Sequence, residues 1–226
     1  MPPVRALVFD FDGLLVDTES AALRAWEETL AGRGLTLPLD LWRAAIGGQG
    51  SDTAMLGYLA DLLGHADAAA LRERWWVRHL ALVDAAPLRP GVAGYLAEAT
   101  RLGLGLAVAS SATGDWVAAH LRRLGTHEAF TVVVTGDTHP AKPAPDTYLG
   151  ALSALGVPAQ EVVAFEDSPA GVRAAKAAGL RCVAVPNPVT SALAFPDADL
   201  LVASLDAIGL PDLLARLGFA VPGRPG

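Results

Sequence analysis

Short apolar runs alternate with amphipathic stretches along most of this chain. The runs are too continuously apolar to leave one face of a sheet in water, which is typical of parallel strands buried on both faces by helices. The predicted strands are 6–11, 104–109, 131–134, 162–165, 181–185 and 200–203. Apolar residues at helical spacing predict helices over 92–102, 115–124, 147–155 and 170–178. The alternation therefore predicts a doubly wound α/β fold with a Rossmann-like parallel sheet.

Residues 17–87 interrupt this alternation and carry only helical patterns. Three stripes have the spacing of buried helix faces: Leu23-Trp26-Leu30, Leu56-Leu59-Leu63 and Leu71-Trp75-Trp76-His79-Leu82. Pro87 and the pair Pro90-Gly91 mark the return to the alternating pattern. We therefore expect an all-helical cap domain, residues 17–87, inserted into an α/β core domain made of 1–16 and 88–226.

Composition narrows the class of protein. Hydrophobic residues make up 52% of the 226 residues and the mean hydropathy is +0.37, which is ample for a buried core. A net charge of −7 argues against a nucleic-acid partner. No apolar run reaches the roughly 18 residues that a membrane span needs, and the acidic first segment makes a poor secretory signal. Cys182 is the single cysteine, and it is expected to be a small buried residue of a cytoplasmic protein. A monomer is compatible with this organisation, and the oligomeric state is left open.

The first predicted strand ends in two carboxylates, Asp10 and Asp12, followed by Gly13. Positions i and i+2 of an extended chain point to the same side, so both side chains enter one small volume. Two such carboxylates repel unless a cation or a shared proton separates them. The pair suits a metal-assisted site in which one acid is the nucleophile and the other carries a proton.

Other predicted strands also end in polar residues. The second ends in Ser110-Ser111, Lys142 follows the third, and the fourth ends in Glu166-Asp167. Ligands of open α/β sheets bind outside the carboxyl ends of the strands, so these groups are expected to converge there. Each has an ordinary alternative: a helix N-cap for the serines, a solvated lysine in a proline-rich turn, and an acidic pair at a helix start.

Taken together, these motifs resemble those of the haloacid dehalogenase superfamily, in particular its phosphatase and β-phosphoglucomutase-like branch with a helical cap. The resemblance covers nearly the whole chain. The segment from Asp10 to Glu19 is similar to the first motif, Ser110 to the second, Lys142 to the third, and Glu166-Asp167 to the fourth.

The resemblance implies a Mg²⁺-dependent phosphatase that acts on a small phosphorylated metabolite, such as a sugar phosphate, through an aspartyl phosphate. Asp10 would be the nucleophile, and Asp12 would protonate the leaving alkoxide and then deprotonate water. The implied metal ligands are Asp10, the backbone carbonyl of Asp12, Asp167 and, directly or through water, Glu166. The implied phosphate-binding residues are Ser110, Ser111 and Lys142.

Three other activities are weighed against this one. Dehalogenation needs no acid at the position of Asp12, so it is disfavoured. A β-phosphoglucomutase-like mutase would carry a histidine early in the first cap helix, where this chain has Ala22. A non-catalytic phosphate-binding or regulatory protein would have no use for a positioned proton carrier.

The cap is expected to choose the substrate. Arg78 aligns roughly with a cap lysine that holds substrate in relatives, although a surface arginine beside Trp75 and Trp76 is an equal alternative. Gln49 is the only polar side chain of a glycine-rich stretch that breaks the cap helices, and it is a candidate specificity residue. The five histidines are scattered, with no pair at i, i+4, so no zinc site is predicted.

Overall fold

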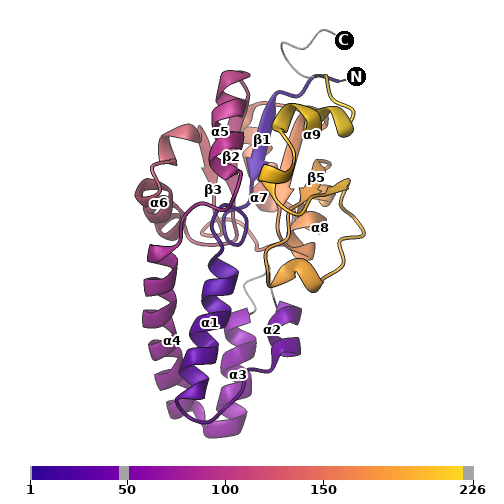
Figure 1. The fold of residues 1–226 in the computed structure, drawn as a ribbon. Helices are drawn as coiled ribbons and strands as arrows, with labels where there is room; N and C mark the ends of the chain where they lie inside the picture. Colours follow the sequence, from indigo (N-terminus) through magenta and orange to yellow (C-terminus); the bar gives the residue numbers. More distant parts are fainter. Residues whose placement is uncertain (1, 46–50, 221–226) are drawn as a thin grey trace.

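A computed structural model describes residues 2–45 and 51–220, and it is built around a parallel sheet of six strands (Figure 1). The strand order is β3-β2-β1-β4-β5-β6, so β1 lies in the middle, between β2 and β4. The strands are β1 (Ala6–Phe9), β2 (Gly105–Ala109), β3 (Val132–Val134), β4 (Val162–Glu166), β5 (Arg181–Ala184) and β6 (Leu200–Leu201). Every pairing is parallel, so all the carboxyl ends meet at one edge.

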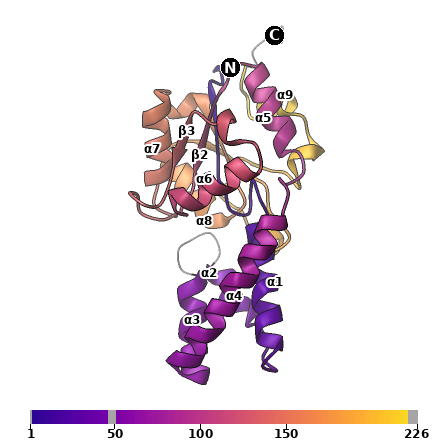
Figure 2. The ribbon, with the colours of Figure 1, turned by 90° about the vertical axis from the view of Figure 1, so that its left-hand side faces the viewer.

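Helices cover both faces of the sheet (Figure 2). Leu7 and Phe9 of β1 face one apolar layer, whereas Ala6 and Val8 face the other. The first layer includes α5 (Val92–Arg101), α6 (Gly114–Arg123) and α9 (Leu210–Arg216), and the second includes α7 (Asp146–Leu155) and α8 (Pro169–Ala177). Short 3₁₀ helices lie at His127–Ala129, Ala159–Glu161, Thr190–Ala192 and Leu205–Ala207. Burial on both faces explains why the strands are apolar throughout.

Four further helices form a separate layer beyond the carboxyl ends of the strands (Figures 1 and 2). They are α1 (Thr18–Ala31), α2 (Leu39–Ala45), α3 (Ser51–Leu63) and α4 (His65–Ala85). Their buried residues form a cluster of their own, in which Trp26 of α1 stacks on Trp75 of α4 with ring centroids 5.0 Å apart. Trp75 also donates from its ring nitrogen to the Ala22 carbonyl oxygen at 3.1 Å.

The chain enters and leaves this helical layer at one place. Val16 and Leu88 form an antiparallel bridge, and the N–H of Arg89 donates to the Leu15 carbonyl oxygen at 2.9 Å. Two adjacent crossings of this kind can act as a hinge. The exact limits of the cap domain, 17–87, stay a prediction.

The doubly wound α/β prediction is confirmed, and the predicted strands and core helices match in order and position. The strands are shorter than the apolar runs: Asp10 and Val185 lie just beyond β1 and β5, although their N–H groups still donate to the carbonyl oxygens of Phe165 and Glu166. The apolar runs gave no indication of two short helices, α2 and α9. Among the described residues, none of the helices is long and apolar enough to cross a membrane.

Candidate active site

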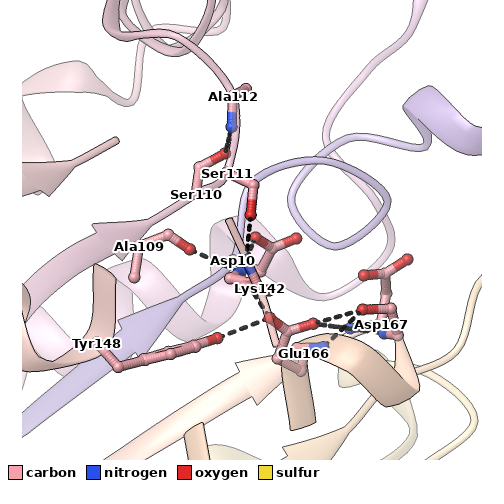
Figure 3. A network of polar contacts seen from close by, with 11 residues as sticks. Asp10, Ala109, Ser110, Ser111, Ala112, Lys142, Tyr148, Glu166 and Asp167 are labelled. Carbon is pink, nitrogen blue, oxygen red and sulfur yellow. Dashed lines mark hydrogen bonds and ion pairs between the residues drawn. The ribbon is translucent and has the colours of Figure 1, made fainter. Parts of the chain in front are cut away.

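Asp10 lies directly after β1 at the carboxyl edge of the sheet. Its N–H donates to the Phe165 carbonyl oxygen at 3.0 Å, and its side chain is buried. Lys142, in the loop between β3 and α7, forms a buried ion pair with the Asp10 carboxylate (Figure 3). The Lys142 ammonium also donates to the Ala109 carbonyl oxygen at 2.9 Å, which ties it to the end of β2. The ends of β1 and β2 and the loop after β3 therefore meet at one edge of the sheet, as the sequence predicts.

Glu166 is the last residue of β4 and is fully buried. Its Oε1 accepts hydrogen bonds from Lys142 Nζ at 2.6 Å and from the Tyr148 hydroxyl at 2.7 Å, while Oε2 accepts from the N–H of Asp167 at 3.1 Å (Figure 3). Gly171 of α8 provides the room, because a Cβ at that position would lie 1.9 Å from Oε1. Both oxygens of Glu166 are therefore held by donors of the protein.

Asp167 is oriented by a residue from beyond the next strand. Asn187 Nδ2 donates to Asp167 Oδ2 at 2.7 Å, and the Asn187 amide oxygen accepts from the N–H groups of Val189 and Thr190, both at 2.9 Å. Gly13 closes over the same carboxylate, since a Cβ there would lie 2.2 Å from Oδ2, and its φ of +79° favours glycine. The position of the Asp167 side chain is thus fixed from two sides.

The three carboxylates form one cluster suited to a hard cation. Asp10, Glu166 and Asp167 each offer an oxygen within 4.8 Å of the others, and all three are buried. Burial raises the pKa of Asp10 to about 8, although Lys142 opposes the shift. Burial, with the nearby Asp10 and Glu166, raises the pKa of Asp167 well above its usual range. Crowded, buried oxygen ligands of this kind fit Mg²⁺, whose charge would relieve their repulsion.

Lys142 stays charged in these surroundings. Burial lowers its pKa, but the carboxylates of Asp10 and Glu166 outweigh that effect and raise it above the usual value. An ammonium group fixed beside the end of β1 can stabilise negative charge that develops on a bound anion.

Asp12 points away from this cluster, toward α6. Its Oδ1 accepts a hydrogen bond from the indole N–H of Trp116 at 3.0 Å. Burial raises the pKa of Asp12, opposed by the Trp116 hydrogen bond, so the protonated form is favoured relative to a solvated aspartic acid. Two carboxylates that are neighbours in sequence therefore have different partners, Lys142 for Asp10 and Trp116 for Asp12.

The serines after β2 shape the loop beside Lys142. The Ser110 hydroxyl oxygen accepts from the N–H of Ala112 at 3.0 Å, and the Ser111 hydroxyl oxygen accepts from the N–H of Lys142 at 3.1 Å (Figure 3). Ser110 is buried and Ser111 is partly exposed. Both lie at the same edge as Asp10, and their role in phosphate binding stays a prediction.

A pocket of about 650 Å³ opens beside Asp12, between the helical layer and α6. Its walls come from α1, α2, α4, α6 and the loop before α6, and they include Trp75, Trp76 and Trp116. The volume suits a small organic molecule. Asp12, the candidate general acid, therefore borders a space that is large enough for a substrate.

The two cap candidates do not join this site in the part of the chain that the structure describes. Arg78 is partly exposed and binds Glu28 of α1, with Nε 2.5 Å from Oε2, and it is not among the residues that line the pocket. Of its two interpretations, the surface arginine fits the structure. Gln49 lies outside the described residues. The neighbours Trp75, Trp76 and His79 face the pocket instead.

Three residues at the site were not predicted from the sequence. Asn187 is a polar residue just after the apolar run of β5, and this position at a strand end is the signal that could have identified it. Arg89 donates to the carbonyl oxygens of Gly13 at 2.5 Å, Val185 at 3.0 Å and Pro186 at 2.7 Å, which joins the loops after β1 and β5. Nothing in the sequence pairs Trp116 with Asp12, 104 residues away.

A family model described as haloacid dehalogenase-like hydrolase matches residues 4–179. The chain belongs to the haloacid dehalogenase-like hydrolases. Within this family it is 38% identical over 219 residues to YhcW of Bacillus subtilis (strain 168), with 95% of this chain and 98% of that protein covered. It is 34% identical over 186 residues to the fructose-1-phosphate phosphatase YqaB of Escherichia coli (strain K12), covering 79% and 95%.

A solved haloacid dehalogenase-like structure agrees with the fold. The crystal structure of CbbY from Rhodobacter sphaeroides, in complex with phosphate, superposes with a TM-score of 0.74 at 36% identity, and the match covers 96% of this chain and 100% of that one. The predicted membership of the family is confirmed. The chain is therefore an enzyme, a phosphoric monoester hydrolase of the haloacid dehalogenase-like type.

Proposed function

We propose that this protein is a Mg²⁺-dependent phosphatase that hydrolyses a small phosphorylated metabolite through an aspartyl phosphate on Asp10. The observation that carries the proposal is the buried contact of Asp10 with Lys142, in a cluster that also holds Glu166 and Asp167. A carboxylate that could serve as the nucleophile, a fixed ammonium group and acids that could ligate a metal lie at one edge of the sheet. The name of YqaB supports a sugar phosphate or a similar metabolite as substrate.

The cation would be held by this edge of the sheet. Asp10 and Asp167 are the proposed direct carboxylate ligands, together with the backbone carbonyl of Asp12. Both Glu166 oxygens already accept hydrogen bonds from the protein, which supports contact through water for that residue. When bound, Mg²⁺ would neutralise charge on the carboxylates and on the phosphoryl group.

Asp10 would form a bond to phosphorus as the bond to the alcohol oxygen breaks. Asp12 would donate its proton to the departing oxygen, and burial already favours the protonated form of this acid. Water, deprotonated by Asp12, would then displace Asp10 from phosphorus. Lys142 would hold the phosphoryl oxygens by charge, and Ser110 would donate a hydrogen bond to one of them.

Mutase chemistry is less well supported. Ala22 lines the pocket beside Asp12, at the place where the mutase pattern carries a histidine. A methyl group there can neither donate nor accept a proton. A purely phosphate-binding protein is also less well supported, because Asp12 borders the pocket and is held by Trp116, and a binding protein would have no use for a positioned proton carrier.

Turnover of p-nitrophenyl phosphate tests the proposal. We expect phosphate release in Mg²⁺, loss of it in excess chelator, and loss of it in Asp10→Asn with an unchanged melting temperature or a higher one. Asp197→Asn, an exposed acid remote from the cluster, is the matched control and should keep full activity. Activity in Asp10→Asn comparable with the wild type would overturn the assigned nucleophile.

A further inference from the structure

One part of the wall of the pocket beside Asp12 is aromatic, and five rings of α4 and α6 contribute to it. The Trp76 and Trp116 rings lie 5.9 Å apart between centroids, the Trp75 and Trp76 rings are also 5.9 Å apart, and His79 lies 5.8 Å from Trp116. Trp116 also packs against His120, with centroids 4.2 Å apart. These rings come from α4 of the helical layer and from α6 of the core, so both parts of the molecule contribute flat faces.

The charged side chains among the described lining residues are all acidic. Asp84 and Asp115 are exposed and carry the negative charge of the lining. Burial raises the pKa of Asp12, and burial with the nearby Asp12 and Asp17 raises the pKa of Glu19 to about 8, so the protonated form of both inner acids is favoured. Neither lysine nor arginine occurs among the described residues of this lining. Burial and the nearby Arg123 lower the pKa of His120, which keeps that ring neutral near pH 7. A second phosphate or a carboxylate would therefore be repelled here.

The reaction places the leaving group in this pocket. A general acid must lie within hydrogen-bond reach of the oxygen that it protonates. Trp116 donates to the same Asp12 carboxylate at 3.0 Å, so a leaving oxygen held by Asp12 lies close to the Trp116 ring. The atoms attached to that oxygen then lie against the aromatic rings that line the pocket.

We propose that this pocket binds the leaving group of a phosphate ester whose alcohol carries a positive charge, such as an amino alcohol or an amino sugar. Aromatic faces attract cations through the negative face of the ring, and carboxylates at the border add to the attraction. This inference rests on the proposed phosphatase function and specifies its substrate class. In the reaction the P–O bond to the alcohol breaks, its electron pair stays on the oxygen, Asp12 supplies the proton, and the cationic nitrogen is unchanged.

Three esters of similar size separate charge from shape: phosphocholine, its neutral isostere 3,3-dimethylbutyl phosphate, and the anionic phosphoglycolate. We expect kcat/KM for phosphocholine to exceed that for the neutral ester by about tenfold, the size expected for a cation against aromatic faces, and phosphoglycolate to be the poorest. Trp76→Leu and Asp115→Asn should each lower the ratio of cationic to neutral ester. Asp197→Asn, outside the pocket, should leave that ratio unchanged.

Turnover of p-nitrophenyl phosphate shows whether a negative result contradicts only the inferred substrate class or also the proposed phosphatase function. If it is hydrolysed in Mg²⁺ but phosphocholine is no better than its neutral isostere, the inference is wrong and the phosphatase function stands. The same holds if phosphoglycolate is the best of the three, or if Trp76→Leu and Asp115→Asn leave the ratio unchanged. If no ester is hydrolysed, the proposed function is itself wrong and the inference falls with it.

Discussion

Asn187 holds Asp167 by a hydrogen bond of 2.7 Å between its amide nitrogen and one carboxylate oxygen. Asn187 is itself fixed, because its amide oxygen accepts two backbone N–H groups in the loop after β5. A residue beyond the fifth strand therefore positions an acid that ends the fourth. Groups that orient the ligands of a metal commonly affect its affinity by 10- to 100-fold.

Replacing this asparagine is expected to weaken Mg²⁺ binding. In Asn187→Ala the Asp167 carboxylate loses its donor, so the Mg²⁺ concentration that gives half-maximal activity should rise by about tenfold or more. Titration of activity with Mg²⁺ measures the shift. Ser191→Ala, an exposed neighbour, is the control and should show none. An unchanged Mg²⁺ dependence in Asn187→Ala would mean that Asp167 does not ligate the metal.

A methyl group at Gly171 is expected to be far more damaging than one at Gly57. A Cβ at Gly171 would meet the buried Glu166 carboxylate at 1.9 Å, so Gly171→Ala should lower the free energy of unfolding by about 1–3 kcal/mol and abolish activity. A Cβ at Gly57 meets nothing within 4 Å, and Gly57→Ala in α3 should stabilise by roughly 0.5–1 kcal/mol. Denaturant unfolding compares the two, and equal effects would contradict the packing around Glu166.

Arg89 is expected to stabilise the loops that carry the site. Its guanidinium donates to three carbonyl oxygens of the loops after β1 and β5, so Arg89→Ala should lower the free energy of unfolding by about 2–3 kcal/mol. Arg101→Ala removes only an exposed pair with Glu98 and should lower the free energy of unfolding far less than Arg89→Ala does. Similar losses from the two variants would show that the Arg89 contacts contribute little.

Stabilisation by Mg²⁺ is expected to depend on pH. Because the pKa of Asp10 is raised to about 8 in the folded protein, the metal-free native state binds more protons than the unfolded state between pH 4 and 8. This group therefore makes the metal-free protein less stable as pH rises through that range, and a bound cation would displace its proton. The rise in melting temperature on adding Mg²⁺ should be larger at pH 8 than at pH 5.5, and Asp10→Asn should reduce the difference. A pH-independent rise would contradict the raised pKa.

The sequence predicted the parts of the site that follow from strand order. Asp10, Lys142 and Glu166 could be placed together because the carboxyl ends of parallel strands meet at one edge. Asn187 also lies at the carboxyl end of a parallel strand, but it follows β5, whose end carries no acidic residue. The contact of Trp116 with Asp12 could not be predicted, because it depends on how α6 lies across the sheet.

The other differences between the predicted site and the structure depend on the direction in which each side chain leaves its helix. Arg78 lies on the same helix as Trp76 and His79, but its direction around the axis takes it to Glu28 instead of the pocket. Residues one or two positions apart on a helix point in different directions, so an approximate alignment cannot choose among them. The aromatic character of the pocket has the same origin, since its rings come from α4 and α6, whose relative placement only the fold reveals.

The proposed mechanism depends most on Asp10 as the nucleophile. Acid quenching during turnover of p-nitrophenyl phosphate in Mg²⁺, followed by peptide mass analysis, tests it most directly. We predict one phosphoryl group on the peptide that contains Asp10, labile to hydroxylamine and absent from Asp10→Asn. Rapid turnover with the phosphoryl group on a different residue, or undiminished turnover in Asp10→Asn, would contradict the account.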